Sequence, residues 1–518
     1  MIAAYLIILA AWCYVALRAW LLPIYHDEAV SLIYIVIPAK SVWDIVTYKA
    51  ATINNHLLNS LAMMVMHRIG GFHEFVLRIP ALLAFGFYSF GILAILKRFL
   101  TRVPLILGLL FCLAHPFVLS HFSIARGYPL ALAFMIWGIF YLLRFLDQAN
   151  SSTLRENAIV FSFALLALAV LSNLAFVNIF LGSALVIFVG LICGAVKNGK
   201  TVKTFSIDLW GHFLFPFLVF AGLLAAIYVK PIIKLNQKEQ FYFGGQEGFW
   251  QDTVGSLIER CFFNITDFSN PSLQGLVVGG LFVVALILAL GFTLILFQIF
   301  RQKRLSSGGT AALTLLATMC VAALSNVLQH WMFGVKYIMG RAAIFYIPLF
   351  LLFVLAVGKM LAECFPKVKN GSHFIFSAGL ISVIVFFLSA VNLSHHYRNN
   401  GADVRAFMRH VIALRHKGIL TEPQIQIRAR QHDQPMFNFY VLKYDLGWVS
   451  FLKSPYLVQS DARRYHVFQL FQEDISLITK HRLALLKYFP MTNSYLGIPR
   501  DMFLRKRMSE VMETHWEQ

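Results

Sequence analysis

The chain has 518 residues, of which 59% are hydrophobic and only 13% are charged. A soluble domain carries about 25% charged residues, and a soluble protein this apolar would expose surface that it cannot cover. The composition therefore excludes an ordinary soluble enzyme, a disordered protein and a disulfide scaffold. It favours a polytopic helical membrane protein, in which each span needs about 20 apolar residues.

The formal net charge is +20. The basic residues mostly lie in short clusters between apolar runs, as the positive-inside rule requires of cytoplasmic loops. No base-reading motif accompanies them, so nucleic acid is not expected as a partner. The six cysteines include no CxxC spacing and indicate neither a disulfide framework nor a zinc site.

Eleven apolar runs predict an all-α membrane protein of about eleven transmembrane helices. The run at 1–22 lacks the early basic residues and the cleavage site of a signal peptide, so we expect a retained span. The other runs are near 75–96, 104–122, 128–146, 158–174, 177–196, 209–229, 273–299, 309–327, 342–361 and 373–391.

Clusters of Lys and Arg follow every second span and place those loops in the cytoplasm, together with the N-terminus. The loops 23–74 and 230–272 are then outside, as is everything after the last span. We therefore expect a transmembrane module over 1–391 and a small extracytoplasmic α/β domain over 392–518. No C-terminal retention signal of the endoplasmic reticulum is present, which favours a bacterial inner membrane.

Several short elements are predicted outside the membrane. Ser31–Ile37 and His56–Ile69 have the pattern of helices that lie in the membrane interface. In the C-terminal domain, Gln424–Arg428 alternates like a strand, whereas Ala402–Lys417 and Ile475–Phe489 are predicted as helices. Aromatic and basic side chains alternate over 437–456, which fits either sugar stacking or the core of a small domain.

The first candidate site is Tyr25-His26-Asp27-Glu28, directly after the first span. If that helix continues this far, two acids at its C-terminus are unfavourable and need another explanation. A carboxylate at a dry interface can act as a general base, and a pair can hold a divalent cation. An ordinary polar start of a loop is the third alternative.

Three further motifs lie on the same side of the membrane. The segment Asn54–Asn59 contains His56, which could contact a metal or a phosphate or could simply be a polar residue at the interface. Arg78 fits a side chain that snorkels to the membrane surface. The turn from His121 to Tyr128 contains Arg126, suited to bidentate phosphate binding, and Gly127, which permits close backbone approach. Lys336–Arg341 adds a second basic point, for which snorkelling at span ends is again the alternative.

The order of these motifs resembles the GT-C glycosyltransferases, in particular the group of protein O-mannosyltransferases and aminoarabinose transferases (family 39-like). The matching residues are Asp27-Glu28, Asn55-His56, Gly70-Gly71 with Arg78-Ile79-Pro80, and Ala125-Arg126-Gly127-Tyr128. The resemblance covers residues 20–145 and, more weakly, 330–350. Leu57 and Leu58 stand where the group has two prolines after the histidine.

The resemblance implies transfer of a sugar from a polyprenyl-phosphate carrier to an acceptor hydroxyl on the outer face, with inversion. Asp27 would be the base, and Glu28 would orient the site or hold an ion. Arg126, Tyr128, Lys336 and Arg341 would contact the donor phosphate. His26, His56 and His121 would contact substrate or an ion.

The expected partners are a polyprenyl-phosphate-linked sugar, the membrane, and a lipid, glycan or protein acceptor. No cofactor is required by the motifs, and a divalent cation is left open. Two other functions compete: a flippase or transporter of lipid-linked saccharide, and an envelope assembly factor without chemistry. A transporter would have ionisable residues deep in its spans and repeated halves, which the sequence lacks.

The charge pattern predicts the topology. Reporter fusions after residue 395 should behave as external, and fusions near residue 200 or 303 as cytoplasmic, because the basic clusters orient the intervening loops. Paired alkaline phosphatase and green fluorescent protein fusions measure this. A cytoplasmic signal from the fusion at 395 contradicts the eleven-span topology.

Overall fold

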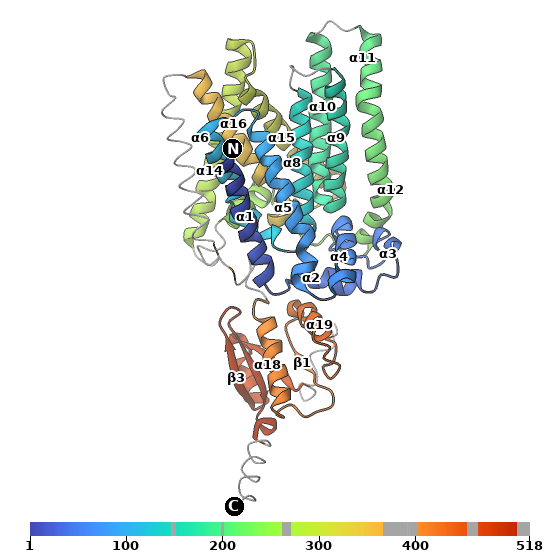
Figure 1. Ribbon diagram of the computed structural model, residues 1–518, viewed down its shortest axis with the longest axis vertical. Coiled ribbons are helices and arrows are strands. Elements are labelled where there is room, and N and C mark those ends of the chain that lie inside the picture. The colour runs from blue at the N-terminus through green and yellow to red at the C-terminus, as the bar shows by residue number, and fades with distance from the viewer. Residues whose placement is uncertain are drawn as a thin grey trace, which may run out of the picture. The chain divides into compact units, whose positions relative to one another are not determined.

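The computed structural model describes residues 1–146, 152–197, 201–261, 271–365, 391, 393, 401–452 and 465–504. These residues form helices and one small sheet (Figure 1). The chain divides into two compact units. The first comprises Met1–Leu17, Ser41–Ala62 and Ile79–Val391, and the second comprises Arg18–Lys40, Met63–Arg78 and Asn392–Gln518. The predicted division at residue 392 stays a prediction, since the second unit also takes in two segments near the N-terminus.

The described residues form eight helical segments that are long and apolar enough to cross a membrane, or nine if one bent pair is a single span. The chain is thus a multi-pass membrane protein. The ten runs predicted before residue 365 each coincide with a helix or with the bent pair, and the run at 373–391 lies outside the described residues. The eight segments contain α1 (Ile2–Leu21), α5 (Glu74–Leu96), α8 (Gly127–Leu146), α10 (Val177–Lys197), α12 (Phe215–Gln237), α14 (Pro271–Phe297), α15 (Ser307–Phe333) and α16 (Tyr346–Cys364). The run at 158–174 coincides with α9 (Ser152–Ser172), whose apolar part is shorter and is not counted among the eight.

The bent pair consists of α6 (Arg102–Leu113) and α7 (Pro116–Phe122), which meet at an angle of 66°. Pro116 is the first residue of α7, where a missing N–H is tolerated, but it cannot continue the hydrogen bonds of α6. The break sends the chain into the turn that carries Arg126, directly before α8.

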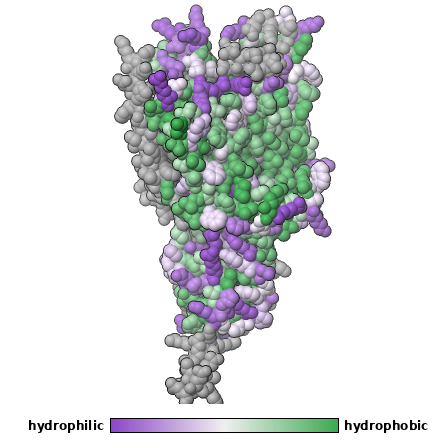
Figure 2. Space-filling model, in the orientation of Figure 1, coloured by the Kyte–Doolittle hydropathy of each residue, from purple (hydrophilic) through white to green (hydrophobic). Residues whose placement is uncertain are grey.

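On the face shown in Figure 2, the surface over the long helices is largely apolar. On α14, the side chains of Val278, Phe282 and Leu286 are all more than half exposed. A continuous apolar surface of this extent would be unfavourable in water. These faces are therefore suited to contact lipid.

The second unit contains a four-stranded sheet of order β1-β2-β4-β3. β1 pairs in parallel with β2, and the other pairs are antiparallel. Every residue of β2 is buried, as expected of a central strand. The strands are β1 (Ile427–Arg428), β2 (Val467–Phe471), β3 (Leu483–Phe489) and β4 (Ser494–Pro499).

Two helices, α18 (Val404–His416) and α19 (Gln434–Lys443), pack with this sheet. The ring of Phe407 on α18 contacts Phe437 on α19 and Phe489 on β3. The predicted α/β character of the C-terminal segment and its helix at 402–417 are therefore confirmed.

Two predicted elements of this segment need correction. The helix predicted over Ile475–Phe489 is wrong in its second half: α20 (Ile475–Lys480) ends at a turn in which Arg482 has φ 47°, and β3 follows. The strand predicted over Gln424–Arg428 is shorter, since only Ile427–Arg428 belong to the sheet and Ile425 forms an isolated bridge to Val449. Pairing with neighbouring strands decides both cases, and a short apolar run does not reveal such pairing.

The contact between α10 and α15 depends on Gly182. A methyl group added there would lie 2.7 Å from the carbonyl oxygen of Thr318. We expect Gly182→Ala to lower the unfolding free energy by about 1–3 kcal/mol through overpacking. Gly222→Ala is the matched control, because nothing lies within 4 Å of its added methyl. Thermal loss of the monodisperse peak in detergent measures both, and equal melting temperatures would contradict the packing argument.

Candidate active site

The acidic pair lies at the start of a new helix. α1 ends at Leu21, the chain turns through Pro23, and α2 (His26–Ser31) begins with Asp27 and Glu28 in its first turn. Helix N-termini favour carboxylates. The anticipated conflict with the C-terminus of the first span does not arise, because α1 does not continue to the acids. Both side chains are buried, with Asp27 3% exposed and Glu28 0% exposed.

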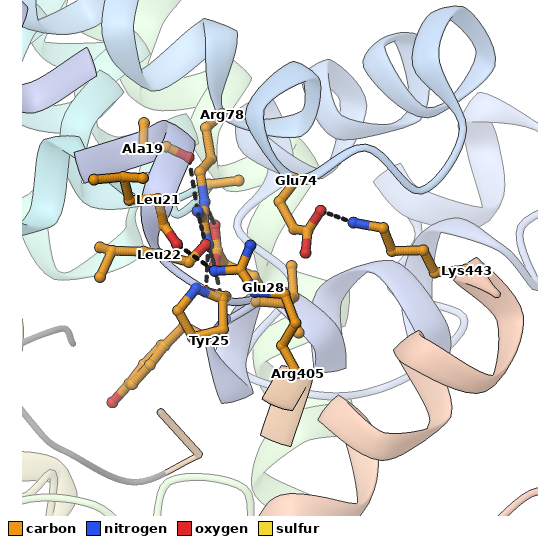
Figure 3. Close-up of polar contacts among 12 residues, drawn as sticks. Ala19, Leu21, Leu22, Tyr25, Glu28, Glu74, Arg78, Arg405 and Lys443 are labelled. Carbon is orange, nitrogen blue, oxygen red and sulfur yellow. Dashed lines mark hydrogen bonds and ion pairs between the residues drawn. The ribbon is translucent and has the colours of Figure 1, made fainter. Parts of the chain in front are cut away.

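Glu28 is held by Arg78 of α5 (Figure 3). The Nε of Arg78 donates to Glu28 Oε1 at 2.8 Å and its Nη2 donates to Oε2 at 2.6 Å, while Oε2 also accepts from the backbone N–H of Tyr25 at 2.8 Å. The side chains of Glu28 and Arg78 are both fully buried. The expectation that Arg78 snorkels to the surface is therefore wrong.

The remaining donors of Arg78 bind the end of α1. Its Nη1 donates to the carbonyls of Ala19 and Leu22 at 2.9 and 2.8 Å, and its Nη2 donates to the carbonyl of Pro23 at 2.8 Å. These bonds and the two to Glu28 use all five N–H groups of the guanidinium. They satisfy carbonyls that a helix end otherwise leaves without partners. One side chain thus fixes the end of α1 and the start of α2.

Both oxygens of Glu28 are engaged by Arg78, which fixes this carboxylate and leaves it ill suited as a metal ligand. Asp27 is the preceding residue in the same first turn, and its carbonyl accepts from the hydroxyl of Ser31 at 2.9 Å. Within the described residues, no group of three or more His, Cys, Asp or Glu side chains is placed to hold a metal ion. We derive no metal-dependent step.

The helix α19 bonds to the segments around the acidic pair. Tyr440 accepts from the backbone N–H of Ile24 at 3.1 Å and donates to Glu74 Oε1 at 3.2 Å. Lys443 forms an ion pair with the same carboxylate (Figure 3). Burial raises the pKa of Tyr440 well above its ordinary value, so the phenol stays protonated and donates at neutral pH. The aromatic and basic residues of this segment were expected either to stack on sugars or to form the core of a small domain. Tyr440 and Phe437 are fully buried and therefore belong to the core.

His26 contacts the C-terminal segment directly. Its ring stacks on that of His432 at 4.0 Å between centroids, and its Nδ1 lies 2.5 Å from the carbonyl oxygen of His432. A carbonyl only accepts, so Nδ1 of His26 carries the proton. The predicted contact of His26 with a substrate therefore falls to its Nε2.

A second group of predicted residues assembles in the first unit. Arg126 is 2% exposed, and its Nη2 donates to Asn54 Oδ1 at 3.1 Å. The ring of Tyr128 lies 5.6 Å from that of His56 and 5.3 Å from that of His121. The structure therefore brings the Asn54–Asn59 motif and the turn after α7 together.

Gly127 is the reason that these two motifs can meet. A Cβ at this position would lie 2.0 Å from the carbonyl oxygen of Ser172 and 2.7 Å from Cβ of His56. Any side chain would push the first loop away from the turn. The close backbone approach that the sequence indicated is confirmed.

The second basic point is fixed by the loop before α14. Lys336 Nζ donates to the carbonyl of Tyr242 at 2.7 Å, and the backbone N–H of Gly340 donates to Ser256 Oγ at 2.8 Å. Arg341 is half-buried in the short helix η6 (Gly340–Ala343). α13 (Ser256–Cys261) contacts both η6 and α7, so one short helix joins the segments of the two basic points.

The acidic pair thus belongs to the second unit, whereas Arg126, Tyr128, Lys336 and Arg341 belong to the first. Convergence of the two groups on one cavity stays a prediction. Sequence reasoning missed the partners of Glu28 and Glu74. The one signal in the sequence was Arg78, an arginine at the start of the next span. Its distance along the chain from a carboxylate partner follows no fixed rule, so the sequence did not show that it pairs with Glu28.

The chain matches no protein-family model and none of the curated proteins. It is similar to two crystal structures of ArnT from Cupriavidus metallidurans. The structure bound to undecaprenyl phosphate gives a TM-score of 0.46 at 13% identity, over 96% of this chain and 97% of that chain. The apo structure gives 0.48 at 10% identity, over 95% and 97%. The function is therefore argued below from the residues of this chain.

The buried pair predicts a sharp difference between two similar substitutions. Glu28→Gln leaves Arg78 buried without its counter-charge and should lower the unfolding free energy by about 3–5 kcal/mol. Glu363→Gln, the control, removes a partly exposed pair with Lys359 of 3.2 Å and should cost less than about 1 kcal/mol. Both are measured by melting in detergent. A Glu28→Gln protein as stable as the wild type would show that the pair does not organise this region.

Proposed function

We propose that this protein is a membrane glycosyltransferase of the GT-C type. It moves a sugar from a polyprenyl-phosphate donor to an acceptor hydroxyl on the outer face of a bacterial inner membrane. The observation that carries the proposal is the anchoring of Glu28 by Arg78, which fixes the adjacent Asp27 in the first turn of a helix. A carboxylate held in this way meets the requirement that a general base be positioned before the reaction.

Asp27 acts as the base in this scheme. The acceptor oxygen attacks the anomeric carbon while its proton passes to the Asp27 carboxylate. The bond from that carbon to the phosphate oxygen breaks, and its electron pair leaves with the lipid-linked phosphate. The attack comes from the side opposite the leaving group, so the configuration inverts. Glu28 takes no proton and acts through the position of α2.

The basic residues of the first unit suit the donor phosphate. Arg126 is buried and donates to a neutral amide, that of Asn54, and in such surroundings a guanidinium binds phosphate more strongly than in water. Arg341, Lys336 and the hydroxyl of Tyr128 are assigned to the same phosphate. This cluster stabilises charge that grows on the leaving group as the bond breaks.

Mass spectrometry of surface glycans and lipids from cells that lack the protein identifies the acceptor. Loss of one sugar from an otherwise intact acceptor supports the transferase. Accumulation of the complete lipid-linked saccharide on the inner leaflet would instead favour a flippase.

The base assignment predicts the effect of Asp27→Asn. The change keeps the shape and removes the proton acceptor, so turnover should fall by about 10²–10⁴-fold, while the melting temperature stays near that of the wild type. Asp44→Asn is the matched control, since Asp44 also lies in the first turn of a short helix, α3 (Val42–Val46), but forms an exposed pair with Lys49. Transfer is measured in nanodiscs with the acceptor found above. Near-normal turnover of Asp27→Asn would remove Asp27 from the mechanism.

A further inference from the structure

A pocket of about 310 Å³ lies within the second unit, at one end of the sheet. It is formed by the segment that leads into α19, the end of β2 and the turn between β3 and β4. Its volume is at the lower end of the range of roughly 300–1,000 Å³ for small-molecule sites. The side chains that the argument uses are Arg430, His432, Asp433, Phe471, Thr492 and Asn493.

Hydrogen bonds to residues outside the pocket hold its polar groups in place. Asp433 is 4% exposed, and its Oδ2 accepts from Gln469 Nε2 at 3.0 Å. The backbone N–H and the hydroxyl of Thr492 donate to Asp403 at 2.8 and 3.0 Å. Asn493 accepts from the hydroxyl of Tyr488 at 3.1 Å. Fixed groups of this kind recognise a ligand without a large entropic cost of ordering.

Donors, acceptors and an aromatic ring occur together in this pocket. The guanidinium of Arg430 lies 3.2 Å from the centre of the Phe471 ring, which fixes the plane of its N–H donors. Asp433 supplies acceptors, whereas Thr492 and Asn493 supply both kinds of group. A sugar requires this combination, because each hydroxyl donates and accepts while the C–H faces of the ring are apolar.

The charges of the pocket nearly cancel. Arg430 pairs with Glu473, and Asp433 Oδ1 lies 3.4 Å from His432 Nδ1. A phosphate or carboxylate ligand would meet the carboxylate of Asp433, and the guanidinium of Arg430 is already paired with Glu473. The balance therefore favours an uncharged ring.

The pocket also adjoins the segment of the acidic pair. His432 lines the pocket and stacks on His26, the residue before Asp27, at 4.0 Å. Both residues belong to the second unit.

We propose that this pocket binds an uncharged sugar unit of the acceptor, next to the Asp27 segment. The acceptor role rests on the proposed transferase function, whereas the sugar specificity rests on the pocket alone. The pocket thus determines which acceptors present a hydroxyl to the base.

Saturation-transfer NMR on the full-length protein in nanodiscs tests the pocket without any donor. The probes are the methyl glycosides of glucose, galactose, mannose and N-acetylglucosamine, with glucose 6-phosphate as the charged comparison. At least one methyl glycoside should bind, and Arg430→Gln should weaken it by about tenfold through loss of charge-assisted bonds. Arg428→Gln is the matched control, because Arg428 forms a similar pair with Asp474 at 3.5 Å but does not line the pocket.

A second variant guards against misfolding. Asn493 has φ 47°, so Asn493→Gly keeps the left-handed backbone and removes only the amide. It should weaken glycoside binding, whereas Asp445→Gly, the same type of change at a left-handed residue (φ 50°) outside the pocket, should retain it. Binding that no pocket variant alters overturns the proposal. So does the absence of any glycoside signal, or tighter binding of glucose 6-phosphate.

Asp27→Asn separates the two proposals. It should lower transfer by about 10²–10⁴-fold and leave glycoside binding intact. If the Asp27→Asn protein binds glycoside and still transfers sugar normally, the base assignment is refuted and the pocket stands. If the Asp27→Asn protein loses transfer but the wild-type protein binds no glycoside, the pocket is refuted and the transferase stands.

Discussion

The guanidinium of Arg78 determines the architecture around the acidic pair. It binds three carbonyls at the end of α1 and both oxygens of Glu28, and every one of its N–H groups is used. Burying two charges is costly, and such a pair stabilises a fold only when its geometry is good and its remaining donors are satisfied. Here both conditions are met. The interaction converts the break at Pro23 into a defined turn between two helices.

Much of the helical framework could be predicted from the sequence. Runs of about 20 apolar residues have few alternatives to a membrane span, and the helices α5 and α8 begin within a residue or two of the predicted starts. The bend before Pro116 has a local cause in the proline, although the run at 104–122 was predicted as one unbroken span. The structure of the segment 475–489 could not be predicted in this way, because Leu483–Phe489 becomes a strand only through its pairing with β4. A helix and a strand both accommodate such a short run.

The candidate site was only partly accessible to sequence reasoning. Position at the span ends and the order of the motifs singled out Asp27, Glu28 and Arg126 as candidates, and the structure shows that all three side chains are buried. Their partners could not be assigned: Glu28 and Arg78 are 50 residues apart, and Arg126 and Asn54 are 72 apart. The resemblance assigned Asp27 as the base and left Glu28 either to orient the site or to hold an ion. The ion pair with Arg78 favours the first of these two roles for Glu28.

The pairing of Glu74 with Lys443 has a consequence for biosynthesis. The two residues are 369 positions apart, and Tyr440 is 366 from the same carboxylate. At about 5–20 residues per second, translation needs roughly 20–70 s to proceed from one partner to the other. During that interval α5 has been synthesised, but Glu74 at its first position has no Lys443 to pair with, because that residue has not yet been translated. The second unit is therefore completed only after translation has passed Lys443, so the early loops depend on the last part of the chain for their final structure.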